Sequence, residues 1–265
     1  MMLDVNHVYK TFHPGTINER RALAGVDLHL EEGDFVTVIG GNGAGKSTLL
    51  NAVAGVWPVD GGSIVIDGND ITGLPDYKRA PFIGRVFQDP MMGTAPDMQL
   101  EENLALAYRR GKKLGLRWHI NREERDMYRE RLRELNLGLE DRLTTKVGLL
   151  SGGQRQAVTL LMASLQKPRL LLLDEHTAAL DPKTAAKVME LTDRIVREDK
   201  LTTLMITHNM RDAIQYGNRL IMLHEGHVIL DISGEEKRKL TVADLLEMFT
   251  RASGSEFAND RAILS

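Results

Sequence analysis

A glycine-rich stretch near the N-terminus lies between a predicted strand and a predicted helix. The β-branched residues 34–39 favour a strand, and residues 47–51 are typical of a helix. The residues between them are Gly40, Gly41, Asn42, Gly43, Ala44, Gly45, Lys46 and Ser47. Glycines in this pattern let backbone N–H groups close around phosphate oxygens at a helix N-terminus. The pattern predicts an α/β fold with a phosphate-binding loop.

Three side chains in and after this loop are candidates for contact with a nucleotide. Lys46 would reach the β- and γ-phosphates, the Ser47 hydroxyl would ligate Mg²⁺, and Thr48 is placed to touch the α-phosphate. The alternative is a glycine-rich turn without a ligand, which the position between a strand and a helix disfavours.

Two acidic residues follow the apolar run Leu170–Leu173. They lie at the carboxyl end of a predicted buried strand, where ligands of α/β proteins bind. Asp174 would hold the Mg²⁺ shell, and Glu175 would polarise the attacking water as a general base. Ordinary surface acids are the alternative, which is improbable downstream of a phosphate loop. Together, the two motifs predict a nucleotide hydrolase.

A third motif narrows this class. Residues 150–154, Leu-Ser-Gly-Gly-Gln, resemble the signature of the ABC ATPase family. A Ser-Gly-Gly turn that opens a helix forms another anion site, with N–H groups and a hydroxyl but no lysine. The resemblance implies a head-to-tail homodimer in which this turn contacts the γ-phosphate held by Lys46 of the other copy. A simple helix cap is the alternative. The residues assigned to ATP binding in trans are Ser151, Gly152, Gly153, Gln154 and Asp181.

The other landmarks of the family appear in order. Gln88 matches the glutamine that touches Mg²⁺ or the attacking water, and His208 matches the switch histidine at the γ-phosphate. Asp181 matches the loop by which the two copies sense each other. Taken singly, these residues could be a loop amide, a strand-end histidine and a helix cap, but their fixed order favours the functional interpretation.

An aromatic residue upstream of the loop is the candidate for the adenine contact. The resemblance assigns Phe12 to stacking on adenine, with Tyr9 as the competing residue and a core position as the alternative for Phe12. The chain departs from the family at Gly41 and His176, where proline is usual. His176 is either a subfamily marker, the interpretation we favour, or a titratable group near the water site.

The resemblance also implies one ABC ATPase domain over residues 1–265, with a phosphate-loop, RecA-like core. The alternation of apolar and polar residues from Leu3 to Leu30 predicts an antiparallel β-subdomain at the N-terminus. Residues 1–90 and 155–240 would form the ATP-binding core with this subdomain, and 91–154 an inserted helical subdomain. Residues 241–265 would form a short helix and a tail.

Composition limits the partners. The chain has no cysteine, which excludes disulfides, thiolate metal sites and thiol nucleophiles. A formal net charge of −3 gives no basis for binding nucleic acid through bulk charge. Because no apolar run approaches the roughly 20 residues of a spanning helix, we expect the chain itself not to cross a membrane.

The sequence therefore predicts an ATP- and Mg²⁺-dependent hydrolase on the cytoplasmic face of the membrane, paired with a separate permease. Residues 88–102 look like those of a bacterial importer subfamily that also has a substrate-binding lipoprotein, with an amino acid as the expected cargo. Met91 and Met92 are candidates for permease contact, unless they fill core gaps. The alternative function is an ATPase for cluster assembly or for signalling through a non-transporting membrane partner.

Overall fold

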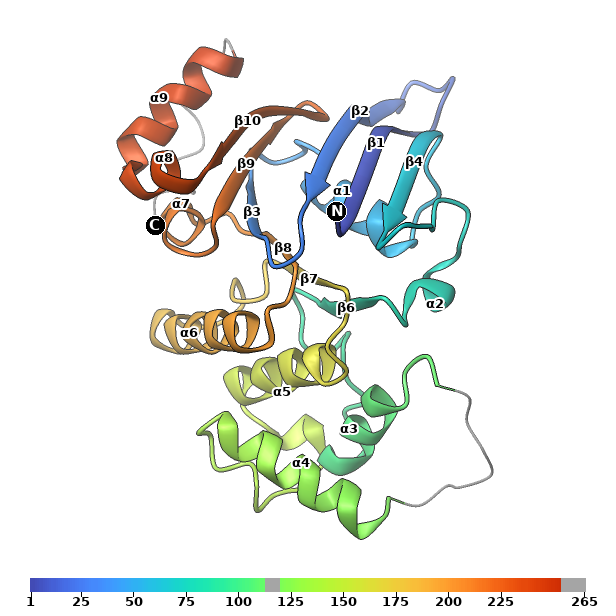
Figure 1. Cartoon of the computed structure of the whole chain (residues 1–265), viewed down its shortest axis with the longest axis vertical. Helices are drawn as coiled ribbons and strands as arrows, with labels where there is room; N and C mark the ends of the chain where they lie inside the picture. Colours follow the sequence, from blue (N-terminus) through green and yellow to red (C-terminus); the bar gives the residue numbers. More distant parts are fainter. Residues whose placement is uncertain (113–119, 254–265) are drawn as a thin grey trace. The chain divides into compact units, whose positions relative to one another are not determined.

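A computed structural model describes residues 1–112 and 120–253 (Figure 1). The chain divides into two compact units. The first contains residues 1–79 and the described residues from Lys200 onward, and the second contains Ala80–Asp199. The domain limits predicted at residues 90, 154 and 240 stay a prediction.

An antiparallel sheet of the first unit has the strand order β2-β1-β4-β5. Its strands are β1 (Leu3–Phe12), β2 (Arg20–Leu30), β4 (Gly61–Ile66) and β5 (Asn69–Asp70). Leu3 pairs with Leu30 on one side and Ile66 on the other, and all three are buried. Alternation of inward and outward side chains explains the apolar–polar pattern of this segment. The predicted antiparallel strands are confirmed.

The first unit also contains the strand that precedes the glycine-rich loop. Strand β3 (Phe35–Ile39) pairs in parallel with β8 (Thr203–Ile206) and β9 (Arg219–His224), and β9 pairs antiparallel with β10 (His227–Ser233). The hairpin of β9 and β10 turns at Glu225 and Gly226, whose φ angles of 49° and 78° suit a two-residue turn. The helices of this unit are α1 (Lys46–Ala54), α2 (Asp76–Arg79), α7 (Met210–Gln215), α8 (Gly234–Lys239) and α9 (Val242–Ser253).

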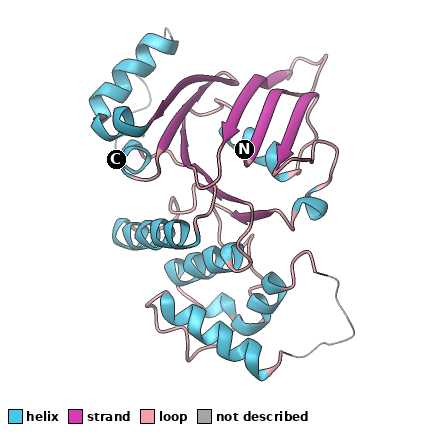
Figure 2. Ribbon diagram, in the orientation of Figure 1, coloured by secondary structure: helices cyan, strands magenta, loops and turns pink. Residues whose placement is uncertain are grey.

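The second unit is mainly helical (Figure 2). Strands β6 (Ile83–Val86) and β7 (Leu170–Asp174) pair in parallel. The helices are α3 (Leu100–Tyr108), α4 (Arg122–Glu134), the short 3-10 helix η1 (Val147–Leu149), α5 (Gly152–Ser164) and α6 (Pro182–Asp199). Helices α3, α4 and α5 each begin with a capping box, so local sequence fixes where they start.

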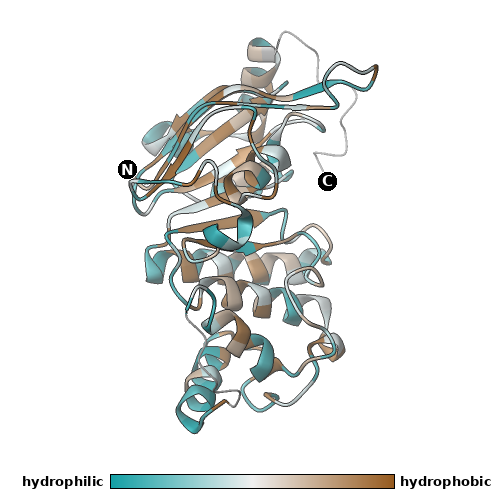
Figure 3. Cartoon of the chain, turned by 90° about the vertical axis from the view of Figure 1, so that its right-hand side faces the viewer, coloured by the Kyte–Doolittle hydropathy of each residue, from teal (hydrophilic) through white to brown (hydrophobic). Residues whose placement is uncertain are grey.

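Apolar residues concentrate along the strands (Figure 3). Leu170–Leu173 of β7 are fully buried, as are Leu104 of α3 and Tyr128 of α4. Burial of such side chains is the main contribution that stabilises each unit. Within the described parts of the chain, no helix combines the length and apolar character needed to span a bilayer. The part of the predicted helix and tail that begins at residue 254 lies outside the described residues.

Candidate active site

The glycine-rich loop connects β3 to α1 in a conformation that requires glycine. Gly40 and Gly45 have φ angles of 150° and 106°. A Cβ atom at Gly40 would lie 2.2 Å from the Leu223 carbonyl oxygen, and one at Gly45 would lie 2.4 Å from that of Ala22. Because these neighbours are backbone atoms, side chains at either position would displace the loop. The glycines therefore allow the loop to fold tightly against the adjoining strands.

Lys46 begins helix α1 and turns back over the loop. Its Nζ atom donates hydrogen bonds to the carbonyl oxygens of Gly40 (2.8 Å) and Gly41 (3.2 Å). The side chain is buried, whereas Ser47 is exposed and Thr48 is half-buried. The ammonium group and the N-terminus of α1 thus give the loop two sources of positive potential for an anion.

His208 lies at the same sheet edge as the loop. Val38 pairs with Ile206, and the Thr207 N–H donates to the Val38 carbonyl oxygen at 3.1 Å. Because β3 and β8 run in parallel, the residues after both strands emerge at one edge. His208 is exposed there, and Asn209 caps α7 immediately afterwards.

Phe12 is linked to the glycine-rich loop through its strand partner Arg20. It pairs across the sheet with Arg20, whose guanidinium donates to the Gly43 carbonyl oxygen at 2.8 Å. The Phe12 ring makes an edge contact with Trp57, with ring centroids 4.9 Å apart. Phe12 is half-buried, so it is not a core residue. The competing residue, Tyr9, packs over Gly25, where an added Cβ would lie 2.8 Å from the Tyr9 hydroxyl oxygen.

The second unit brings three other predicted residues to one edge. Val86 of β6 pairs with Leu173 of β7, so Gln88 and the Asp174–Glu175 pair follow the carboxyl ends of neighbouring parallel strands. Glu175 has a φ angle of 43°, in the left-handed region that a non-glycine residue rarely adopts. Such conformations are costly and gather at functional sites, which agrees with the predicted role of this residue.

Arg85 is a residue at this edge that the sequence analysis missed. Its Nη2 atom lies 3.7 Å from Oδ2 of Asp174. Arginine three residues before Gln88 has no meaning in the linear pattern, and only the register of β6 against β7 makes the contact visible. A cation therefore lies beside the carboxylate predicted to hold a metal ion.

The Ser-Gly-Gly turn forms the N-terminus of α5. The Gln154 N–H donates to Oγ of Ser151 at 3.3 Å, and the Ser151 N–H donates to Oε1 of Gln154 at 3.2 Å. Ser151 and Gly152 are exposed, and Gly153 is half-buried against Thr184. The turn caps its helix while its outer surface stays exposed, so capping and anion binding are compatible.

Asp181 caps the next helix. Its Oδ1 atom accepts a hydrogen bond from the Thr184 N–H at 3.1 Å, and hydrogen bonds from Thr184 hold the pKa of Asp181 below its usual value. Between α5 and α6 lies a groove of about 600 Å³ that includes Ser151, Gly153 and Thr184 in its lining. The signature turn and the Asp181 loop therefore share one surface of this unit.

His176 is buried against helix α6. It is 2% exposed, and its Nε2 atom lies 2.9 Å from the hydroxyl oxygen of Thr192 in α6. Burial lowers the pKa of His176 to about 4. The imidazole is neutral at physiological pH, so the idea of a second titratable group near the attacking water is wrong.

Two further features of this unit bear on the predictions. Met91 and Met92 are 40% and 70% exposed, so they do not fill core gaps.

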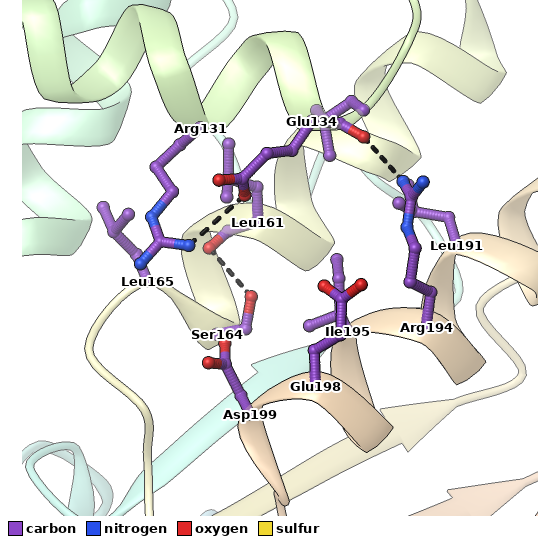
Figure 4. Close-up of a pocket in the computed structure, with 11 residues that line it drawn as sticks. Arg131, Glu134, Leu161, Ser164, Leu165, Leu191, Arg194, Ile195, Glu198 and Asp199 are labelled. Carbon is purple, nitrogen blue, oxygen red and sulfur yellow. Dashed lines mark hydrogen bonds and ion pairs between the residues drawn. The ribbon is translucent and has the colours of Figure 1, made fainter.

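A smaller cavity of about 80 Å³ lies among α4, α5 and α6 (Figure 4). Arg194 in its wall donates to the Glu134 carbonyl oxygen at 2.6 Å and ties α6 to α4. None of the predicted site residues lines this cavity.

The fold and these sites define a nucleotide-binding protein with a phosphate-binding loop. A family model described as ABC transporter matches residues 23–178. The tyrosine transport ATP-binding protein of Clostridioides difficile (strain R20291) is 49% identical over 257 residues, covering 95% of this chain and 100% of that protein. The ABC transporter ATP-binding protein YxdL of Bacillus subtilis (strain 168) is 33% identical over 265 residues, covering 98% and 96%.

Solved structures agree. A dimeric, post-hydrolysis structure of the ATP-binding cassette MJ0796 bound to ADP and Pi aligns with a TM-score of 0.74 at 32% identity, covering 88% of this chain and 98% of that chain. The ADP conformation of the ABC transporter cassette MJ1267 aligns with a TM-score of 0.75 at 27% identity, covering 94% and 98%. The chain belongs to the ABC transporter family. It is the ATP-binding subunit of a transporter and hydrolyses ATP to power transport. The predicted family, fold class and ATPase activity are confirmed.

Proposed function

We propose that this chain drives the import of an aromatic amino acid by a separate membrane permease. Support for the cargo comes from the relative at 49% identity, whose name is tyrosine transport ATP-binding protein. The relatives described above are transporter subunits or cassettes, so the cluster-assembly and signalling alternative receives no support. The observation that carries the ATP-driven part of the proposal is the glycine-rich loop, in a chain of this family. The Gly40 carbonyl oxygen of this loop accepts a hydrogen bond from Lys46.

Residue roles follow from the chemistry of γ-phosphate transfer to water. Lys46 and the N-terminus of α1 neutralise charge on the phosphates, with Thr48 at the α-phosphate, and Phe12 stacks on adenine. Glu175 accepts a proton from the attacking water. At the same time the water oxygen bonds to the γ-phosphorus, and the bond between the γ-phosphorus and the ADP oxygen breaks. His208 contacts the γ-phosphate and steadies the developing negative charge.

The donor set fits Mg²⁺. The Ser47 hydroxyl, the Asp174 carboxylate and the Gln88 amide oxygen are hard oxygen donors, which this ion prefers together with phosphate oxygens and water. When bound, Mg²⁺ would neutralise the β- and γ-phosphates. Gln88 and Asp174 already share the edge formed by β6 and β7.

We further propose that two copies act head-to-tail. The exposed turn of Ser151 and Gly153 would complete the γ-phosphate site of the other copy, and Asp181 would face the partner. MJ0796, which is 32% identical to this chain, was solved as a dimer bound to ADP and Pi, which supports the arrangement.

The membrane partners remain part of the proposal. The chain would lie on the cytoplasmic face of the membrane through its permease, and a substrate-binding lipoprotein would deliver the solute. Exposed Met91 and Met92 offer an apolar contact for the permease.

Reconstitution tests this function. The permease that co-purifies with the tagged chain is placed with it in proteoliposomes, and ATP hydrolysis is measured with L-tyrosine, L-lysine or spermidine and the cognate binding protein. Stimulation by tyrosine alone supports the proposal. Stimulation by another solute contradicts the cargo, and co-purification of soluble partners without any permease contradicts transport.

A further inference from the structure

Arg85 brings a positive charge to the carboxyl end of β7. Its strand, β6, lies beside β7 (Figure 1). Arg85 pairs in register with Leu172 of β7, two residues before Asp174. The Nη2–Oδ2 distance of 3.7 Å is that of an ion pair and exceeds an ordinary hydrogen-bond length. The two side chains are only 15% and 17% exposed, so solvent screens their attraction weakly.

Packing fixes the guanidinium in this place. Its Cζ atom lies 4.5 Å from the centre of the Phe87 ring, which offers a negative face to the cation. The Phe87 carbonyl oxygen accepts a hydrogen bond from Nε2 of Gln156 in α5 at 3.3 Å. Burial lowers the pKa of Arg85 and Asp174 raises it, but a guanidinium remains charged at any physiological pH.

We propose that Arg85 is a positioning residue that limits the affinity of Asp174 for the metal ion. The inference rests on the proposed role of Asp174 as an Mg²⁺ ligand. Without metal, the guanidinium compensates the carboxylate at the strand end. When a divalent cation binds, the two positive charges repel across the same carboxylate. Arg85 therefore favours release of the metal with ADP, which returns the site to its starting state.

The direct test measures metal binding and not turnover. The background is Glu175→Gln, which is expected to bind ATP without hydrolysing it. Bound and free Mn²⁺ are determined by electron paramagnetic resonance for this parent and for the same protein with Arg85→Met or Arg85→Lys. Arg85→Met is expected to bind Mn²⁺ about three- to tenfold more tightly, because a cation near a carboxylate has an effect of this order on its ligand affinity. Arg85→Lys keeps the charge and is expected to retain the affinity of the parent.

A matched control removes another poorly accessible arginine. Arg110 donates to the Ala163 carbonyl oxygen at 3.1 Å, and its pKa is lowered by burial alone. Arg110→Met should leave Mn²⁺ affinity unchanged. If Arg85→Met does not fold, as judged by thermal melting in EDTA, Arg85→Gln takes its place.

The outcomes separate this inference from the proposed function. Affinity in Arg85→Met that is unchanged, or weaker, overturns the role of Arg85. Asp174→Asn tests the metal ligand itself and should lose Mn²⁺ binding at least tenfold. If Asp174→Asn binds normally, the assignment of Asp174 fails. If Asp174→Asn loses Mn²⁺ binding but Arg85→Met keeps the affinity of the parent, Asp174 stands as a metal ligand and only the inference about Arg85 fails.

Discussion

The imidazole Nε2 atom of His176 lies 2.9 Å from the hydroxyl oxygen of Thr192. Thr192 donates its own proton to the Val188 carbonyl oxygen at 2.8 Å, so its oxygen accepts from His176, which must carry the proton on Nε2. The pair ties the residue after Glu175 to helix α6. A neutral, buried histidine thus supports the backbone on which the predicted general base is held.

This geometry predicts an acid-sensitive stability. The pKa of His176 falls from 6.5 to about 4 on folding, so the unfolded chain binds more protons between these pH values. Stability is therefore lost as pH falls from 6.5 towards 4, at up to about 1.4 kcal/mol per pH unit. Urea unfolding of the wild type should lose about 2 kcal/mol more between pH 7 and 5 than unfolding of His176→Asn. Equal losses would contradict a buried, neutral histidine.

Removing the Lys46 ammonium should abolish nucleotide binding. The Nζ atom is held by two loop carbonyl oxygens and has no other cation in its motif to replace it. Lys46→Ala should lower ATP hydrolysis by about a hundredfold or more, with an unchanged circular dichroism spectrum. Binding of a fluorescent ATP analogue checks the cause. Wild-type binding by this variant would show that the loop does not hold phosphate through Lys46.

The two candidate aromatics should respond differently to truncation. Phe12→Ala should raise the KM for ATP by about five- to a hundredfold, the effect of losing one base-stacking contact, with a smaller change in kcat. Tyr9→Ala is the control, since Tyr9 packs over Gly25. A larger KM effect in Tyr9→Ala would reverse the assignment. Because Trp57 touches the Phe12 ring, its fluorescence should also change on ATP binding.

The stability lost by substituting Gly153 should be regained by a second substitution at Thr184. An added Cβ would lie 2.2 Å from Cγ2 of Thr184, so Gly153→Ala should destabilise the fold by about 1–3 kcal/mol through overpacking of α5 against α6. Thr184→Ser removes that methyl group, and the Thr184 Cβ lies 3.7 Å from the added atom. The double variant should regain most of the loss in urea unfolding. An additive loss would show that the two side chains do not interact.

Local patterns were enough to predict much of the fold. Alternation in residues 3–30 and the buried run at 170–173 predicted strands, because all side chains on one face of a strand share the same environment, either core or solvent. The Ser151 and Gln154 capping pair likewise marks the start of α5. The phosphate loop was visible because its glycines and lysine are consecutive in sequence.

Contacts between distant segments were not visible. Arg85 meets Asp174 only through the register of β6 and β7, and Trp57 meets Phe12 only once β1 and the segment after α1 pack together. The sequence left open a second interpretation of His176, as a titratable group, because it follows Glu175. The left-handed backbone at Glu175 instead precedes a side chain that is buried against α6. Direction of a side chain is set by tertiary packing and is not written in a linear motif.

The most direct test of the account is the mass of Glu175→Gln by size-exclusion chromatography with light scattering, with and without ATP and Mg²⁺. We predict a monomer without nucleotide and a dimer with it, because ATP is trapped between Lys46 of one copy and the Ser151 turn of the other. Ser151→Arg in the same background should bind ATP and stay monomeric. A Glu175→Gln protein that binds ATP but remains a monomer would contradict the shared-site mechanism.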